Sequence, residues 1–124
     1  MTVQTVLAEQ LDPHRPRRII VVGSGYAGMT ACVTLGKRVK PSDDIEIVLV
    51  SILPYQEALS ELDLVVAGNP RPNWVELWHG DVFKNLPIKI VYDRIDSVDL
   101  ESKSIKLGPK GAPTSTIPFW RLIL

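Results

Sequence analysis

The glycine-rich segment at residues 23–28 is the part of the sequence whose residue types and spacing could do chemistry. It is a complete G-x-G-x-x-G pattern, reading Gly23-Ser24-Gly25-Tyr26-Ala27-Gly28. Gly23 would permit a tight turn, Gly25 has no side chain to hold a phosphate away from the backbone, and Gly28 would let a helix pack closely. If a helix begins here, the amides of Ser24–Ala27 lack intrahelical partners and carry partial positive charge, so they could bind a diphosphate.

The flanking residues predict the elements that such a loop requires. Arg18–Val22 is a largely β-branched run without polar alternation, which is typical of a strand covered on both faces. Apolar residues at helical spacing predict a helix from Tyr26 to about Lys40, which Pro41 ends. Ile45–Val50 predicts a second buried strand. Strand, helix and strand in close succession predict a βαβ unit whose two strands are parallel neighbours.

The residue that ends the second strand distinguishes between interpretations of the glycines. They could form only a tight corner, or a methyltransferase-type loop, whereas dinucleotide sites end this strand with an acidic side chain that accepts from the ribose hydroxyls. The position here is Ser51, a weaker partner than a carboxylate. Glu46 matches by spacing but would lie about 16 Å from the carboxyl edge of the sheet. Because no arginine follows at residues 52–56 to neutralise a 2′-phosphate, we favour a weakened adenosine site over one for NADP.

The rest of the chain predicts a leader, further helices and a β-rich tail. Residues 1–16 carry only a short apolar patch and two prolines, which indicates a flexible leader. A helix is predicted for Gln56–Ala67, and a capping-box pattern predicts a short helix over Trp74–His79. Four short β-rich runs follow, which we expect to form a small antiparallel unit: Ile88–Tyr92, Ile95–Val98, Ser104–Leu107 and Arg121–Leu124.

Composition excludes several classes of function. The 124 residues suit a single domain, and 14 basic against 14 acidic side chains leave no electrostatic footprint for nucleic acid. The single cysteine, Cys32, excludes an internal disulfide and a CxxC pair, and its place on an apolar helical stripe predicts a buried core residue. No apolar run approaches the roughly 18 residues of a membrane helix, and no histidine–carboxylate cluster has metal-ligand spacing. We therefore expect a cytoplasmic protein without a metal site.

Read together, these segments resemble the type II NADH dehydrogenases and related FAD-dependent pyridine nucleotide oxidoreductases, over about residues 17–124. Residues 18–31 are similar to the first strand and FAD loop of that family, including an aromatic-Ala pair between the second and third glycines. Residues 54–68 resemble the helix and glycine after the second strand. Residues 91–99 resemble the segment whose backbone, near Ile95, lies against the adenine. Residues 117–124 resemble the strand that leads into an Ala-Thr-Gly turn.

The resemblance implies an α/β fold, a Rossmann-like FAD/NAD(P)-binding domain in which a parallel sheet with helices and a small antiparallel unit make three layers. It implies FAD as cofactor and NADH as co-substrate, with hydride passing to the flavin and then to a quinone or other acceptor. The glycine loop would hold the pyrophosphate, with Ser51 at the ribose. Residues 17–124 would be an incomplete domain, because the second glycine loop and the later flavin-binding segments of the family are not in this sequence. No catalytic residue is expected within it.

Two other classes of function stay open at this point. The chain could be a non-enzymatic module that binds ADP, NAD or FAD, or a nucleotide-free domain that dimerises through an exposed strand edge at Leu122–Leu124. A full-length form could also contact the inner face of a membrane peripherally, as the family resemblance implies.

Overall fold

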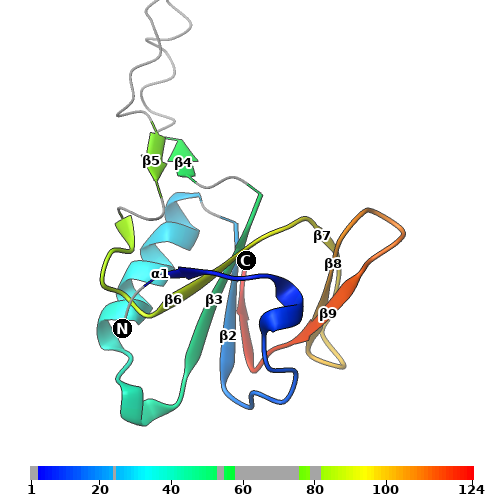
Figure 1. Cartoon of the computed structure of the whole chain (residues 1–124), viewed down its shortest axis with the longest axis horizontal. Helices are drawn as coiled ribbons and strands as arrows, with labels where there is room; N and C mark the ends of the chain where they lie inside the picture. Colours follow the sequence, from blue (N-terminus) through cyan, green and yellow to red (C-terminus); the bar gives the residue numbers. More distant parts are fainter. Residues whose placement is uncertain (1–2, 24, 53–54, 58–75, 79–81) are drawn as a thin grey trace, which may run out of the picture.

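The computed structural model describes residues 3–23, 25–52, 55–57, 76–78 and 82–124. Its centre is a five-stranded parallel sheet in the order β1-β6-β3-β2-β10 (Figure 1). The strands of this sheet are β1 (Gln4–Thr5), β2 (Arg18–Val22), β3 (Glu46–Ser51), β6 (Ile88–Tyr92) and β10 (Arg121–Ile123). Helix α1 (Tyr26–Arg38) connects β2 to β3, and the short 3-10 helices are η1 (Ala8–Gln10) and η2 (Pro41–Asp43). The predicted βαβ unit is confirmed, with β2 and β3 paired in parallel.

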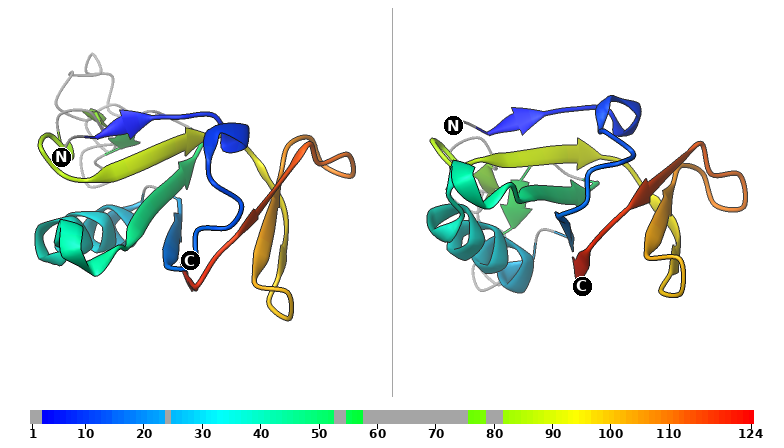
Figure 2. Two further views of the ribbon diagram at one scale, coloured as in Figure 1. Left: turned by 60° about the horizontal axis from the view of Figure 1, so that its bottom comes forward. Right: turned by 90° about the horizontal axis from the view of Figure 1, so that it is seen from below.

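A second sheet makes the fold three-layered. Strands β7 (Ile95–Asp99), β8 (Ser104–Leu107) and β9 (Ser115–Pro118) form an antiparallel sheet, and Figure 2 shows it on the opposite side of the parallel sheet from α1. The predicted α/β fold, a parallel Rossmann-like sheet with an antiparallel unit, is therefore confirmed.

Alternate residues of the central strands fill two separate cores, which explains why these strands show no polar alternation. Ile19 and Val21 of β2 pack in a cluster with Met29 and Cys32 of α1. Ile20, between them, packs in a second cluster that includes residues of the antiparallel sheet. The central strands therefore have no face open to solvent, and any ligand must approach from their ends.

Several predicted elements differ from the structure. Ile88–Tyr92 and the last strand belong to the parallel sheet, while the antiparallel unit includes β9, which the sequence did not indicate. The short helix predicted over Trp74–His79 is wrong, because residues 76–78 form β5 (Glu76–Trp78), which pairs antiparallel with β4 (Tyr55–Glu57). Backbone pairing with a distant segment overrides the local capping pattern here. The first two residues of the helix predicted for Gln56–Ala67 belong instead to strand β4, and the other residues of that prediction lie outside the described residues.

Part of the segment predicted as a flexible leader is held against the sheet. β1 pairs in parallel with β6, and the Val6 amide donates to the Ile90 carbonyl at 2.9 Å. Ala8 and Leu11 are buried in the core next to the antiparallel sheet. The short apolar patch of the leader thus packs in the core, because β1 pairs with the edge of the distant strand β6.

A buried ion pair closes the amino end of the parallel sheet. Arg18 begins β2 and Glu46 begins β3, and the Arg18 Nε atom donates to Glu46 Oε1 at 2.6 Å. The same guanidinium donates to the Asp12 carbonyl and to the Pro118 carbonyl, so it connects the leader, β3 and β9. Lys89 of β6 donates to Glu46 Oε2 at 2.9 Å. Five segments of the chain, the leader, β2, β3, β6 and β9, therefore meet at one pair of charges.

Glu46→Gln should destabilise the fold by about 3–5 kcal/mol at neutral pH, because it leaves the Arg18 charge buried without its partner. Burial alone would raise the pKa of Glu46, but hydrogen bonds from Arg18 and Lys89 hold it below its ordinary value of 4.5. A carboxyl with a lowered folded-state pKa stabilises the fold above the unfolded pKa, and this contribution is lost as pH falls through the folded value. Denaturant unfolding of both proteins from neutral pH downward should therefore show the difference shrinking below pH 4.5.

The exposed Glu101, changed to Gln, provides the matched control and should leave stability nearly unchanged at every pH. An equal and pH-independent effect of the two substitutions would contradict a stabilising role for the buried pair.

Candidate functional site

The glycine loop lies at the carboxyl end of β2 and leads directly into α1. Gly23 has a φ of +83°, which favours glycine, and its amide donates to the Val50 carbonyl at 2.8 Å. Gly25 is the N-cap of α1, and its carbonyl accepts from the Met29 amide at 2.9 Å. Ser24 lies outside the described residues. The loop therefore has the strand-to-helix position that the motif requires.

Gly28 sits where the helix crosses closest to the strand end. A Cβ atom on Gly28 would stand 2.2 Å from the Gly23 carbonyl oxygen, so any side chain would force the helix and loop apart. Gly25 is different, because no described residue other than its chain neighbours has an atom within 4 Å of the position of its Cβ. The motif thus combines one glycine required by packing with one that leaves open space in front of the backbone. That open space is what a phosphate approaching the loop would need.

The first turn of α1 offers amide donors to a ligand. Among the described residues, no side chain caps the helix N-terminus, and no acidic residue lies in its first turn. The backbone N–H groups of residues such as Tyr26 and Ala27 therefore have no intrahelical acceptor, and no described side chain supplies a capping oxygen. Together with the partial positive charge of the helix end, this arrangement suits an anionic group.

A cavity of about 390 Å³ adjoins the loop at the carboxyl end of the sheet. That volume is within the range of small-molecule sites. Its lining residues come from three chain segments: Val22, Gly23, Val50, Ser51, Ile52, Asp93, Arg94 and Ile95. The cavity thus brings together three of the predicted site residues, Gly23, Ser51 and Ile95. Gly25, Tyr26, Ala27 and Gly28 are in the adjoining loop and first turn and do not line the cavity.

Ser51 ends β3 at this edge, as the sequence predicts. It is buried, and its carbonyl accepts from the Asp93 amide at 3.1 Å. Glu46 is at the opposite end of the same strand, committed to the ion pair with Arg18. The acid that spacing alone would have selected is therefore remote from the cavity.

Ile95 begins β7 and is half-buried against the core on the antiparallel side of the sheet. A register shift between Ile95 and Ser97 interrupts the pairing of β7 with β8 directly after it. The segment predicted to lie against an adenine is thus at the cavity wall, where the chain passes from the parallel to the antiparallel sheet.

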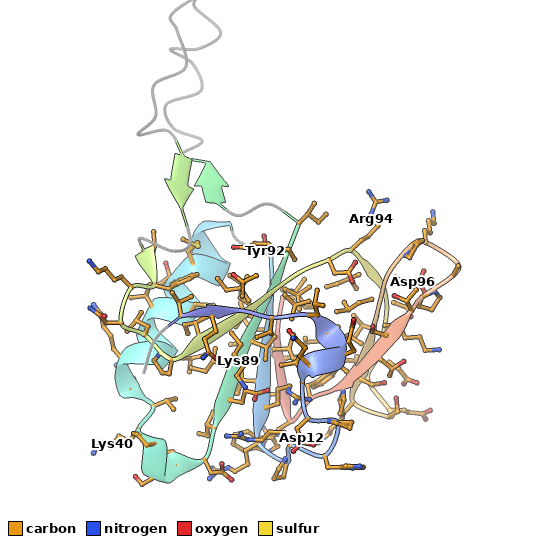
Figure 3. All side chains as sticks on the ribbon, in the orientation of Figure 1. Asp12, Lys40, Lys89, Tyr92, Arg94 and Asp96 are labelled. Carbon is orange, nitrogen blue, oxygen red and sulfur yellow. The ribbon has the colours of Figure 1, made fainter. Side chains whose placement is uncertain are left out.

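Asp93 and Arg94 line the cavity but were not among the predicted site residues. Asp93 Oδ1 accepts from the Arg94 amide at 2.7 Å, and the Arg94 carbonyl accepts from the Gly108 amide at 2.8 Å, so both residues are fixed by hydrogen bonds. Asp93 is half-buried, whereas Arg94 is exposed and projects from the edge of the molecule (Figure 3). Their position directly after the strand Ile88–Tyr92 could have identified them from the sequence, because the carboxyl ends of parallel strands meet at one edge of the sheet.

Other candidate groups do not form a second site among the described residues. Cys32 is fully buried in the core beside α1, as predicted, and burial raises its pKa from 9.0 to about 12. His14 is exposed, and His79 lies outside the described residues. In the described part of the chain, no three His, Cys, Asp or Glu side chains gather in a way that could hold a metal ion. No helix within that same part has the length and apolarity needed to cross a membrane.

Comparisons with known proteins identify a shared fold. No protein-family model and no curated protein sequence matches the chain. Sulfide:quinone oxidoreductase from the hyperthermophilic bacterium Aquifex aeolicus matches with a TM-score of 0.71 at 16% identity, over 86% of this chain and 23% of that protein. NDH2 from Plasmodium falciparum, in complex with RYL-552, matches with a TM-score of 0.66 at 19% identity, over 87% of this chain and 21% of that protein. The chain thus spans less than a quarter of either protein.

Gly28→Ala should destabilise the fold by about 1–3 kcal/mol, because the added methyl group overlaps the Gly23 carbonyl and the loop must shift. Gly25→Ala is the matched control, since its φ of −70° suits alanine and its Cβ position is open. Denaturant unfolding of the two variants and the unaltered protein measures the difference. Equal stability of Gly28→Ala and Gly25→Ala would contradict the close approach of helix and loop.

Cys32 should not react with iodoacetamide in the native protein at mildly alkaline pH, because the thiol is buried and its pKa is about 12. After unfolding in guanidinium chloride, the same thiol should alkylate fully, as mass spectrometry would show. Rapid alkylation of the native protein would instead identify an accessible thiolate.

Proposed function

We propose that this chain is the FAD-binding portion of a flavin-dependent NADH oxidoreductase. In the complete reaction, hydride passes from NADH to FAD and then to a quinone or another acceptor. The observation that carries the proposal is the single cavity that joins the end of the glycine loop at Gly23 to Ser51 and Ile95. Dinucleotide sites hold the pyrophosphate at the glycine loop and the ribose at the end of the second strand. The family resemblance implies the adenine contact near Ile95.

The residues fit the adenosine diphosphate half of FAD. The amides of the loop and of the first turn of α1 would bind the pyrophosphate, and the open space in front of Gly25 would admit it. The ribose would then lie over the end of β3, near Ser51, and the adenine against the backbone at Ile95. FAD, when bound, would supply the redox chemistry, while this chain would bind and orient it.

The likeness to a sulfide:quinone oxidoreductase and to NDH2 supports the oxidoreductase assignment, because it agrees with the family resemblance in the sequence. The 124 residues contain one G-x-G-x-x-G motif, which we assign to FAD, and no second such motif for NADH. We therefore assign cofactor binding, and no catalytic residue, to this chain.

Gly25→Val should abolish binding of ADP and FAD while leaving the fold intact. The valine side chain would occupy the open space that the pyrophosphate needs, and its Cβ atom would lie more than 4 Å from every described residue other than its chain neighbours. The measurement is a titration of each protein with ADP and with FAD by calorimetry, alongside thermal unfolding with and without ligand. Ligand at 100 times its Kd should stabilise the unaltered protein by about 2.7 kcal/mol and the variant not at all.

Thr34→Val is the matched control, because it adds a valine at an exposed position of α1 beyond the loop and the cavity. It should bind both ligands as the unaltered chain does. If Gly25→Val and the unaltered protein respond identically to ADP and FAD, the loop is only a corner and the proposal fails.

A further inference from the structure

We propose that Asp93 is the ribose-binding carboxylate of this site, in place of the acid that dinucleotide sites carry at the end of the second βαβ strand. The inference rests on the proposed function, because it assigns a contact within the same adenosine site. It adds a specificity-determining residue from the end of β6.

The strand end at Ser51 leaves the ribose without a charged acceptor. A serine hydroxyl is a neutral acceptor, whereas hydrogen bonds to an ionised carboxylate are roughly twice as strong as those between neutral groups. Glu46, the only acid on β3, is buried at the opposite end of the strand and paired with Arg18. A carboxylate for the ribose must therefore come from another segment at the carboxyl edge.

Asp93 is the acid that the structure brings to this edge. Its amide donates to the Ser51 carbonyl at 3.1 Å, which continues the pairing of β3 with β6 by one residue beyond Ser51–Tyr92. Asp93 directly follows β6, and β6 is the strand next to β3, which Ser51 ends. Neighbouring strands are roughly 4.8 Å apart, so the backbones at Asp93 and Ser51 lie side by side. Gly23, Ser51 and Asp93 line the same cavity at the ends of three adjacent strands. A ligand that extends from the loop across Ser51 would next meet Asp93.

The carboxylate of Asp93 is available to a ligand. One of its oxygens, Oδ1, accepts from the Arg94 amide at 2.7 Å, and this bond orients the group. Among the described residues, no basic side chain forms an ion pair with Asp93, in contrast to Glu46. The half-buried side chain therefore has an oxygen that can accept a hydrogen bond from a ribose hydroxyl.

Asp93 also predicts which adenine nucleotides the site rejects. A phosphate on the ribose 2′-oxygen would place negative charge beside the carboxylate, and like charges at short range repel. Arg94 is the opposing charge at this cavity, but it is exposed, and Figure 3 shows its side chain projecting outward from the end of β6. Screening by water weakens an exposed charge more than a half-buried one. The site should therefore prefer ADP to ADP that carries a 2′-phosphate.

The test compares three probes, ADP, 2′-deoxy-ADP and 2′-phospho-ADP, by calorimetry on the full chain. The unaltered protein should bind ADP about tenfold more tightly than 2′-deoxy-ADP, because the deoxy probe leaves the carboxylate without its donor. Asp93→Asn preserves the shape and the acceptor for the Arg94 amide but removes the charge. It should bind ADP several-fold more weakly, distinguish little between ADP and 2′-deoxy-ADP, and tolerate the 2′-phosphate better.

Two further variants separate a ribose contact from a structural role. Asp96→Asn is the matched control, because Asp96 lies on β7, its Oδ1 accepts from the Gly111 amide at 2.7 Å, and it does not line the cavity. It should retain the preferences of the unaltered protein among the probes. Adding Ser51→Glu to Asp93→Asn returns an acid to the end of β3 and should restore the preference for ADP over 2′-deoxy-ADP.

The outcomes distinguish this inference from the proposed function. If the unaltered protein binds ADP but does not distinguish it from 2′-deoxy-ADP, or binds 2′-phospho-ADP more tightly, the role of Asp93 is overturned while the nucleotide site stands. An Asp93→Asn protein with unaltered preferences overturns it as well. If the unaltered protein binds none of the three probes, the proposed function itself fails, and the role of Asp93 fails with it.

Discussion

Burial of both faces of the parallel sheet is the constraint on which the rest of this structure depends. Helix α1 covers one face and the antiparallel strands β7–β9 cover the other, so the central strands β2, β3 and β6 are apolar nearly throughout. Such a sheet can meet a ligand only at the ends of its strands. The two ends of the sheet differ, because buried charges fill the amino end and a cavity lies at the carboxyl end.

A buried ion pair fills the amino end of the parallel sheet. Arg18 and Glu46 are both buried, and their hydrogen bonds join β2, β3, β6, β9 and the leader. An ion pair shielded from water demands that every partner be in place, so it favours one arrangement of these segments over others. The same arrangement removes Glu46 from any role with a ligand. Glu46 lies at about the number of residues after the glycine loop where a ribose-binding acid is expected. The match has no functional meaning, because the length of β3 separates Glu46 from the carboxyl end of the sheet.

The carboxyl end is left open by backbone geometry. Gly28 allows α1 to pass against the Gly23 carbonyl, and Gly25 leaves space in front of the loop. Strand β6 then brings Asp93 and Arg94 beside Ser51 in the same cavity. The proposed site is therefore distributed over the ends of three strands. In this arrangement Asp93, after β6, can supply the charged hydrogen-bond acceptor that Ser51, at the end of β3, lacks.

The sequence by itself determined the βαβ unit, the glycine loop at its first turn and the burial of Cys32, because each depends on residues close together in the chain. It also indicated β7, β8 and the final strand, but not which sheet each joins, since strand pairing depends on partners far away in sequence. The capping pattern near Trp78 predicted a helix where pairing with Tyr55–Glu57 makes a strand. Only the tertiary structure brought Asp93 beside Ser51 and held Glu46 at the far end, because the edge where parallel strands end is assembled from segments that the chain keeps apart.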